Sequence, residues 1–377
     1  MPAIIDKSNP KPIFVRTPMP TTFKSELERQ RYWGKEKEIW HKGYSEDVNG
    51  MLYFYATQVT LKDRVTGRLD YPNVRDAEVV IFNHIKKAHE NGNAPMVIKG
   101  RGIGFSSIGM TLPFYFWKMY AGSTCIATSK DKGTLATLFT EKTMIAYDEM
   151  HKDIKPDLIR KNQTAAESYL KTGANYLSHT GEAKYAESIF LCRDTQESEK
   201  AATKFSGAGA IYGFADEFWL MPRAFSFFNS AIEVFKDHAT NRVKGLLLMG
   251  GTLEDTVPQE AIGKLYDIWQ KASIMNISPF FLPATYGKHV VNGHSDHKRA
   301  EEEILKRRDE LDKLDDKSFL RAYIKNNPLV IEDIFNMRGG GMFDDYTLQV
   351  VNKQLQDLPN APKPIGFYNI IESKENV

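Results

Sequence analysis

The chain has 377 residues, of which 42% are hydrophobic and 26% charged, and its 50 basic and 48 acidic residues leave a formal net charge of +2. This length predicts two structural units or one large α/β domain with additions, and the 22 Phe, 17 Tyr and 5 Trp residues exclude a wholly disordered chain. A net charge near zero means that any basic surface for nucleic acid has to be local, and two cysteines are too few for a disulfide framework or a cysteine-based zinc site.

The predicted elements begin with an extended arm over residues 1–20, which contain five prolines and no signal for secretion. Apolar residues at helical spacing predict an amphipathic helix over 22–42. Residues 51–61 are rich in aromatic and β-branched types, which predicts a strand. The apolar face of 76–91 predicts a second helix.

Beyond residue 95, short apolar runs alternate with longer helical stretches. The runs are 96–98, 123–127, 188–191, 210–215 and 245–249. Such a series is typical of a mostly parallel sheet with helices on both faces. The most apolar stretch, 103–117, is too short and too polar to span a membrane, and Pro113 is expected to kink its helix. Residues 295–317 are almost purely charged and predict a solvated surface helix.

A glycine-rich segment connects one of the predicted strands to the following helix. Its members, the candidate nucleotide-binding residues, are Lys99, Gly100, Arg101, Gly102, Ile103, Gly104, Phe105, Ser106 and Ser107. Backbone N–H groups of such a loop can converge on phosphate oxygens, and Ser106 has the position of a magnesium ligand. Phe105 replaces the usual lysine, but Lys99 can fold back over the phosphates and Arg101 adds a second cation. A glycine-rich turn without a ligand is the alternative.

Two further signals follow the loop, each at the end of an apolar run. Asp216 and Glu217 form an acidic pair, suited to holding Mg²⁺ and to polarising an attacking water, respectively. Thr252, after Gly250 and Gly251, is a candidate for coupling the γ-phosphate to movement. A solvent-exposed acidic turn and a plain glycine turn are the alternatives, but carboxyl ends of adjacent parallel strands are where ligands bind in such sheets.

Together these residues resemble the N-terminal ATPase domain of the large terminase subunit of tailed bacteriophages, over nearly the whole chain. Residues 99–106 are similar to the family's deviant Walker A, 214–217 to its Walker B with catalytic glutamate, and 250–252 to its coupling motif. The stretch 327–344 is similar to the one that closes the domain. Residues 71–76 lie where the adenine-contacting motif falls, and they lack its glutamine, so Gln58 and Arg75 are the candidate adenine residues.

The resemblance implies an α/β P-loop fold of the additional-strand type with a small lid-like helical subdomain. The expected divisions are an arm (1–20), an ATPase core (21–284), a lid and linker (285–345), and a C-terminal helix with a proline-rich linker (346–377). The family's nuclease domain is not expected within this chain, because too little sequence follows residue 345 to build it.

The resemblance also implies a motor that uses ATP and Mg²⁺ to move double-stranded DNA into a procapsid. Glu217 and Arg101 are its candidate catalytic residues, and Ser106 and Asp216 its candidate Mg²⁺ ligands. The implied partners are DNA, a portal protein, a small terminase subunit and further copies of the chain in a ring, with five as the expected number, in the host cytoplasm. A P-loop helicase of another lineage and a non-hydrolysing structural protein with a relic loop are the alternatives.

Overall fold

A computed structural model describes residues 10–63, 66–163, 168–177, 180–193, 210–221, 224–237, 239–240, 242–253, 257 and 259–335. The chain separates into two compact units, Met1–Ile334 and Phe335–Val377. The predicted C-terminal helix and linker, and the closing residues 336–344, lie outside the described part.

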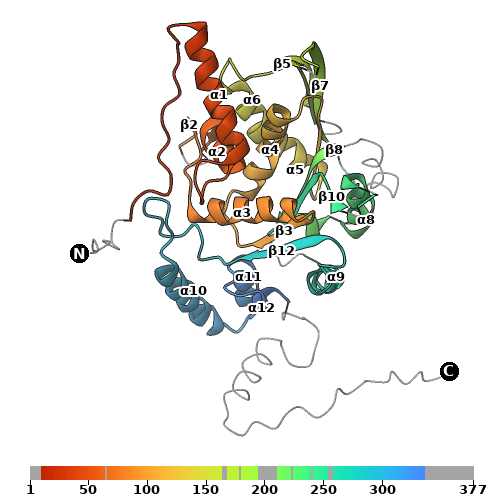
Figure 1. Cartoon of the computed structure of the whole chain (residues 1–377). Coiled ribbons are helices and arrows are strands. Elements are labelled where there is room, and N and C mark those ends of the chain that lie inside the picture. Colours follow the sequence, from red (N-terminus) through yellow and green to blue (C-terminus); the bar gives the residue numbers. More distant parts are fainter. Residues whose placement is uncertain are drawn as a thin grey trace, which may run out of the picture. The chain divides into compact units, whose positions relative to one another are not determined.

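An eight-stranded sheet forms the centre of the first unit (Figure 1), with the order β12-β3-β11-β8-β4-β7-β6-β5. Its strands are β3 (Ala94–Lys99), β4 (Thr124–Thr128), β5 (Asp157–Gln163), β6 (Ser168–Leu177), β7 (Ala183–Cys192), β8 (Ala210–Asp216), β11 (Leu246–Gly251) and β12 (Ile277–Leu282). All neighbours from β12 to β7 pair in parallel, whereas β6 pairs antiparallel with β7 and with β5. The predicted mostly parallel α/β sheet is confirmed.

Strand β11 is inserted between β3, which leads into the glycine-rich loop, and β8, which ends in the acidic pair. Gly250 of β11 lies beside Val97 of β3 and Asp216 of β8. This insertion is the additional-strand arrangement that was expected. Because the three strands run in parallel, their carboxyl ends meet at one edge of the sheet.

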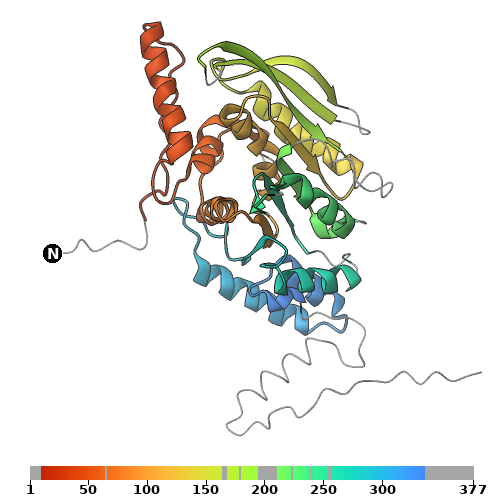
Figure 2. The same cartoon turned by 45° about the vertical axis from the view of Figure 1, so that its right-hand side comes forward.

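Helices cover both faces of the central strands. A Cβ atom on Gly213 would lie 2.6 Å from Phe235 of α8 (Ala224–Phe235), whereas Phe214 reaches Gly109 of α4 (Phe105–Met119). Neighbouring residues of a strand point to opposite faces, so α4 and α8 pack on opposite sides of β8. Figure 2 shows the two helices on either side of the sheet.

The remaining elements surround this centre. The other helices are α1 (Glu26–Lys42), α2 (Gly50–Gln58), α3 (Asp76–Glu90), α5 (Lys132–Leu138), the π-helix η1 (Phe139–Met144), α6 (Ile145–Asp148), the 3-10 helix η3 (Phe218–Leu220), α9 (Gln259–Gln270), α10 (His297–Asp312), α11 (Ser318–Asn326) and α12 (Glu332–Phe335). The short strands are β1 (Leu61–Lys62) with β2 (Leu69–Asp70), and β9 (Lys236–Asp237) with β10 (Arg242–Val243). The helices predicted over 22–42, 76–91 and 295–317 are confirmed as α1, α3 and α10.

The strand predicted over 51–61 is wrong, because most of this segment forms helix α2. All nine of its residues are buried, so the sequence shows neither strand alternation nor an amphipathic helical pattern. The Asn49 side chain accepts a hydrogen bond from the Leu52 backbone N–H at 3.1 Å and caps the helix. A Cβ atom on Gly50 would lie 1.9 Å from the Trp40 carbonyl oxygen, so this glycine permits close packing of α2 on α1.

Helix α4 continues through Pro113, which has no N–H to donate to the carbonyl of Gly109. The buried Tyr212 hydroxyl donates to that carbonyl at 2.8 Å instead. A side chain of β8 therefore satisfies the acceptor that the proline leaves without its helical partner. Among the described residues, no helix is both long and apolar enough to cross a bilayer.

Candidate nucleotide-binding site

The glycine-rich segment forms a tight turn between β3 and α4. Gly102 and Gly104 have φ angles of 90° and 81°, in the region that favours glycine, and Gly104 directly precedes the first residue of α4. Phe105 is 1% exposed and packs on Phe214, with ring centroids 5.6 Å apart. The residue at the usual lysine position therefore belongs to the core, and it anchors the start of α4 to β8.

Two neighbouring segments hold the outside of the turn. The Arg75 guanidinium donates to the Ile103 carbonyl at 2.9 Å and forms an ion pair with the buried Glu78. The Arg101 backbone N–H donates to the Asn326 carbonyl at 3.3 Å, at the end of α11. The loop is thus attached to α3 on one side and to the C-terminal helices on the other.

The Ser106 hydroxyl donates to Asp216 Oδ1 at 3.0 Å, which joins the first turn of α4 to the end of β8. Asp216 is 3% exposed, and burial raises the pKa of its carboxyl group, opposed by the Ser106 hydrogen bond and the charge of Lys99. A hydroxyl and a carboxylate are oxygen ligands of the kind that Mg²⁺ prefers. These two residues therefore fit the oxygen-donor set of a magnesium ion.

A second chain of hydrogen bonds crosses the ends of β3, β11 and β8. The Lys99 ammonium donates to the Thr252 hydroxyl at 2.9 Å, and the Thr252 backbone N–H donates to Glu217 Oε2 at 2.9 Å. Lys99 and Thr252 are 5% and 2% exposed. The predicted coupling residue therefore contacts both the loop lysine and the acidic pair.

Glu217 has a φ angle of 48°, a left-handed conformation that is uncommon for a residue with a side chain. A Cβ atom on the neighbouring Gly251 would lie 2.6 Å from Glu217 Oε2 and 2.8 Å from its Cα. A Cβ atom on Gly250 would lie 2.5 Å from the Val97 carbonyl oxygen. The two glycines therefore let the strand ends approach closely enough for Glu217 to turn toward Thr252.

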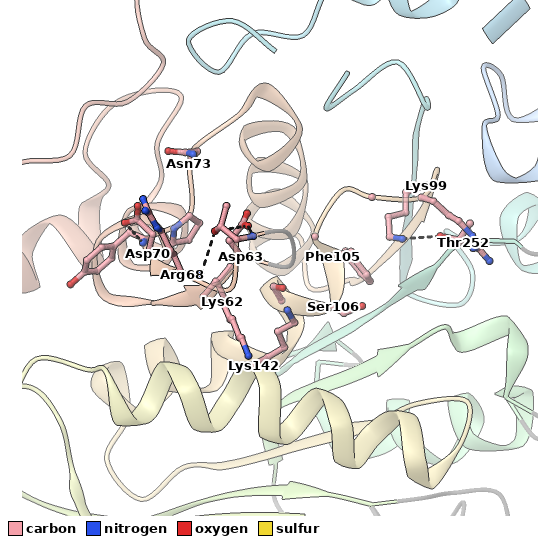
Figure 3. Close-up of a pocket in the computed structure, with 18 of the residues that line it drawn as sticks. Lys62, Asp63, Arg68, Asp70, Asn73, Lys99, Phe105, Ser106, Lys142 and Thr252 are labelled. Carbon is pink, nitrogen blue, oxygen red and sulfur yellow. Dashed lines mark hydrogen bonds between the residues drawn. The ribbon is translucent and has the colours of Figure 1, made fainter. Parts of the chain in front are cut away.

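A pocket of about 910 Å³ opens above these strand ends (Figure 3). The predicted site residues that line it are Lys99, Arg101, Gly102, Gly104, Phe105, Ser106, Ser107, Glu217 and Thr252. Asp216 is not among the lining residues, but it accepts a hydrogen bond from Ser106, which lines the pocket. Gly100 and Ile103 support the loop from behind: Gly100 packs on Ala284, and Ile103 is buried.

The opposite wall of the pocket comes from the β1–β2 hairpin and the segment after it. Its residues are Leu61, Lys62, Asp63, Thr66, Arg68, Asp70, Tyr71, Pro72 and Asn73. The Arg16 guanidinium of the N-terminal arm lies 3.5 Å from the centre of the Tyr71 ring, so the arm covers the outside of this wall. The family resemblance predicts an adenine-contacting motif at 71–76, and Tyr71, Pro72 and Asn73 of this segment line the pocket.

Gln58 and Arg75, the candidate adenine residues, do not line the pocket. Gln58 is 2% exposed at the end of α2, and Arg75 is engaged by Glu78 and the Ile103 carbonyl. Sequence reasoning missed the hairpin residues 61–70 and also Lys142 of η1, which line the pocket. No motif marks them, because only the folding of distant segments brings them to the loop.

The fold and the site together define a class, the additional-strand P-loop type of α/β protein. No protein-family model and no curated protein matches the sequence. Among solved structures, the chain is similar to the large terminase of the thermophilic bacteriophage D6E, with 13% identity and a TM-score of 0.38 over 56% of this chain and 46% of that one. The matched region thus spans less than half the length of the D6E protein.

Two further structural neighbours are of the same kind. The large terminase ATPase domain of Thermus phage P74-26 is 14% identical, with a TM-score of 0.38 over 64% of this chain and 90% of that one. The D6E large terminase in complex with ADP is 13% identical, with a TM-score of 0.39 over 68% of this chain and 54% of that one. These neighbours belong to the family that the sequence motifs resemble.

Proposed function

We propose that this chain binds ATP with Mg²⁺ and hydrolyses it. One observation carries the proposal: a phosphate-loop turn, a hydroxyl–carboxylate pair and a second carboxylate converge at the carboxyl edge of β3, β11 and β8. Ser106 bonded to Asp216 and Thr252 bonded to both Lys99 and Glu217 form this cluster. Ligands in open α/β sheets bind at this edge.

The proposed roles follow from chemistry and position. Backbone N–H groups of 100–107 hold the phosphates at the N-terminus of α4, and Lys99 and Arg101 balance their charge. Ser106 and Asp216 hold Mg²⁺, which when bound draws charge from the phosphate oxygens. Glu217 orients the attacking water and accepts its proton.

Thr252 gives the site a means of coupling. Its hydroxyl accepts a hydrogen bond from Lys99, and its backbone N–H donates one to Glu217. A phosphate that attracts Lys99 would therefore change the contacts of Thr252, and through them the position of Glu217. In the proposed cycle, Thr252 links occupancy of the phosphate site to the orientation of Glu217. This role suits a motor, in which hydrolysis has to be timed by movement.

We further propose that the ATPase drives translocation of double-stranded DNA during viral packaging in the host cytoplasm. The support is the set of motifs that resemble the large terminase family in their order along the chain. The portal protein, the small terminase subunit and a ring of copies are proposed on the same ground. The hydrolytic step can be tested without any of these partners.

The test is an ATPase assay of the full chain with and without double-stranded DNA. Wild-type protein should turn over ATP, and Glu217→Gln should retain nucleotide but lose about 10²–10⁴-fold in kcat, because an amide does not accept the proton. Lys99→Ala should weaken binding and turnover together. Glu149→Gln, at an exposed position outside the pocket, is the control and should behave as wild type.

The outcomes separate the alternatives. Binding of ATP without turnover in the wild type would favour a non-hydrolysing protein with a relic loop. Turnover with strand separation of a tailed duplex would favour a helicase. Full activity in Glu217→Gln would contradict the assigned base.

A further inference from the structure

The loop has an unusual distribution of positive charge. A standard phosphate loop carries a lysine directly before its Ser or Thr, where this chain has the buried Phe105. Lys99 stands at the other end of the loop and bonds to Thr252, the residue that follows β11. The displaced lysine therefore lies on the β11 side of Asp216.

Lys142 approaches the same pocket from the other side. Its helix η1 follows β4, and β4 and β11 flank β8 on opposite sides. Lys142 is 5% exposed and lines the pocket. Figure 3 shows its side chain extending from the helix toward Ser106 at the start of α4.

The local backbone explains this orientation. Residues 139–144 form a π-helical turn between α5 and α6, and such turns shift side chains out of the regular helical register. The next residue, Thr143, donates its hydroxyl to the Met110 carbonyl of α4 at 2.9 Å. This bond fixes the rotation of the π-turn against α4 and holds Lys142 toward the pocket.

We propose that Lys142 is a third phosphate-binding cation of the site, beside Lys99 and Arg101, and that it contacts a phosphate shared by ATP and ADP. The inference rests on the proposed nucleotide function. The β1–β2 hairpin, which forms the outer wall of the pocket, packs against η1, so Lys142 lies on the side of the pocket away from Thr252 and Glu217. A cation there contacts ground state and transition state alike, and it strengthens binding without accelerating the chemical step.

The experiment uses Lys142→Met in the full chain, because methionine keeps most of the side-chain length and removes the charge. The Kd for ADP and the KM for ATP should both rise by about tenfold to a hundredfold, the range for loss of a hydrogen bond to a charged group. The kcat should remain within about threefold of wild type. Lys142→Arg should recover most of the affinity.

Glu141→Ala is the matched control, since this exposed neighbour lies on the same π-turn outside the pocket and should leave both constants unchanged. Thermal unfolding checks that each variant is folded, and Lys142→Gln replaces Lys142→Met if the latter unfolds. Unchanged ADP affinity in a folded charge-removing variant, or a loss confined to kcat, would overturn the proposal. Failure of wild-type protein to bind any nucleotide would instead contradict the proposed function itself.

Discussion

Gly251 and Glu217 show how single residues define the proposed chemistry. Gly251 lies so close to Glu217 that there is no room for a Cβ atom on Gly251. Glu217, directly after Asp216, has a left-handed backbone conformation. Strained backbone of this kind is stabilised only by surrounding contacts. Here those contacts include the Thr252 backbone N–H.

Gly251→Ala should therefore lower kcat by at least about tenfold while ADP binding changes little, because the new methyl group displaces Glu217 and leaves the loop in place. Gly263→Ala is the control, since Gly263 lies within α9 and, among the described residues, a Cβ there would have no neighbour within 4 Å beyond its own stretch of helix. Helix propensity predicts that this control is stabilised by about 0.5–1 kcal/mol. Steady-state kinetics and thermal unfolding measure both effects. Wild-type turnover in Gly251→Ala would show that Glu217 tolerates the displacement.

Asp216 predicts a pH dependence of stability. Burial raises its pKa in the folded protein, so the folded state binds a proton more tightly than the unfolded state, whose carboxyl titrates near pH 3.9. The protonated Asp216 carboxyl therefore contributes to the stability of the fold below about pH 3.9. This contribution is lost as the pH rises through the pKa that Asp216 has in the folded protein. Asp216→Asn does not titrate, and its melting temperature relative to wild type should therefore increase from pH 4 to pH 7.

The measurement is thermal unfolding without nucleotide or Mg²⁺. Asp237→Asn provides a control of opposite sign, because hydrogen bonds from Lys244 and Thr240 lower the pKa of Asp237 to about 2. Its stabilising effect is present above the unfolded pKa and is lost as pH falls toward 2, so Asp237→Asn should be less stable than wild type at pH 7. A pH-independent difference for Asp216→Asn would contradict the raised pKa.

At the scale of elements, helix α4 depends on a strand for its continuity. Pro113 removes the donor to the Gly109 carbonyl, and Tyr212 of β8 replaces it. Tyr212→Phe should lower the free energy of unfolding by about 1–3 kcal/mol, because a buried acceptor is left without a partner. Tyr120→Phe, at a 49% exposed position, should change it by less than about 0.5 kcal/mol. Chemical denaturation distinguishes the two, and equal effects would exclude the assigned role of Tyr212.

The elements also show where sequence patterns sufficed. The short apolar runs predicted five strands of the sheet, because buried parallel strands are apolar on both faces. These runs are 96–98, 123–127, 188–191, 210–215 and 245–249, and they fall on β3, β4, β7, β8 and β11. Helix α2 was predicted as a strand, since complete burial removes any periodicity. Strands β5 and β6 were not predicted: β5 is almost entirely exposed and has no apolar run. Strand β12, at the edge of the sheet, was not predicted because it contains Pro279, a residue that is uncommon within strands.

The residues of the candidate site also fall into two groups, those that the sequence pattern predicted and those that it did not. Lys99, Ser106, Asp216, Glu217 and Thr252 were identifiable because each directly follows or ends a predicted strand, or begins the helix after it. The hairpin wall and Lys142 come from segments whose positions depend on tertiary packing. A sequence pattern therefore predicted the strand-end side of the pocket and not its opposite wall.

At the scale of the whole unit, the C-terminal helices support the loop through Arg308. Its guanidinium donates to Asp333 at 2.6 Å and to the Asn327 carbonyl at 3.0 Å, next to the Asn326 carbonyl that accepts from Arg101. The paired side chains are only 13% and 10% exposed. Arg308 thereby fixes the backbone against which the loop rests.

Arg308→Ala should lower the free energy of unfolding by about 3–5 kcal/mol, because it leaves a buried carboxylate without its cation. ADP affinity should fall as well, since the segment behind Arg101 loses its anchor. Arg307→Ala is the matched control: its ion pair with Glu310 is about half exposed and contributes at most about 1 kcal/mol. Denaturant unfolding and ADP titration test the pair. Similar stability of the two variants would contradict the buried contact.

The insertion of β11 separates two buried charged side chains, Lys99 at the end of β3 and Asp216 at the end of β8. Neighbouring strands lie about 4.8 Å apart, so the ends of β3 and β8 are separated by roughly 10 Å. At the end of β3, the Lys99 ammonium donates a hydrogen bond to the Thr252 hydroxyl. At the end of β8, the Asp216 carboxylate accepts a hydrogen bond from the Ser106 hydroxyl. The inserted strand thus acts as a spacer between opposite buried charges, and a polyanion that carries its own divalent cation is the electrostatic complement of that gap.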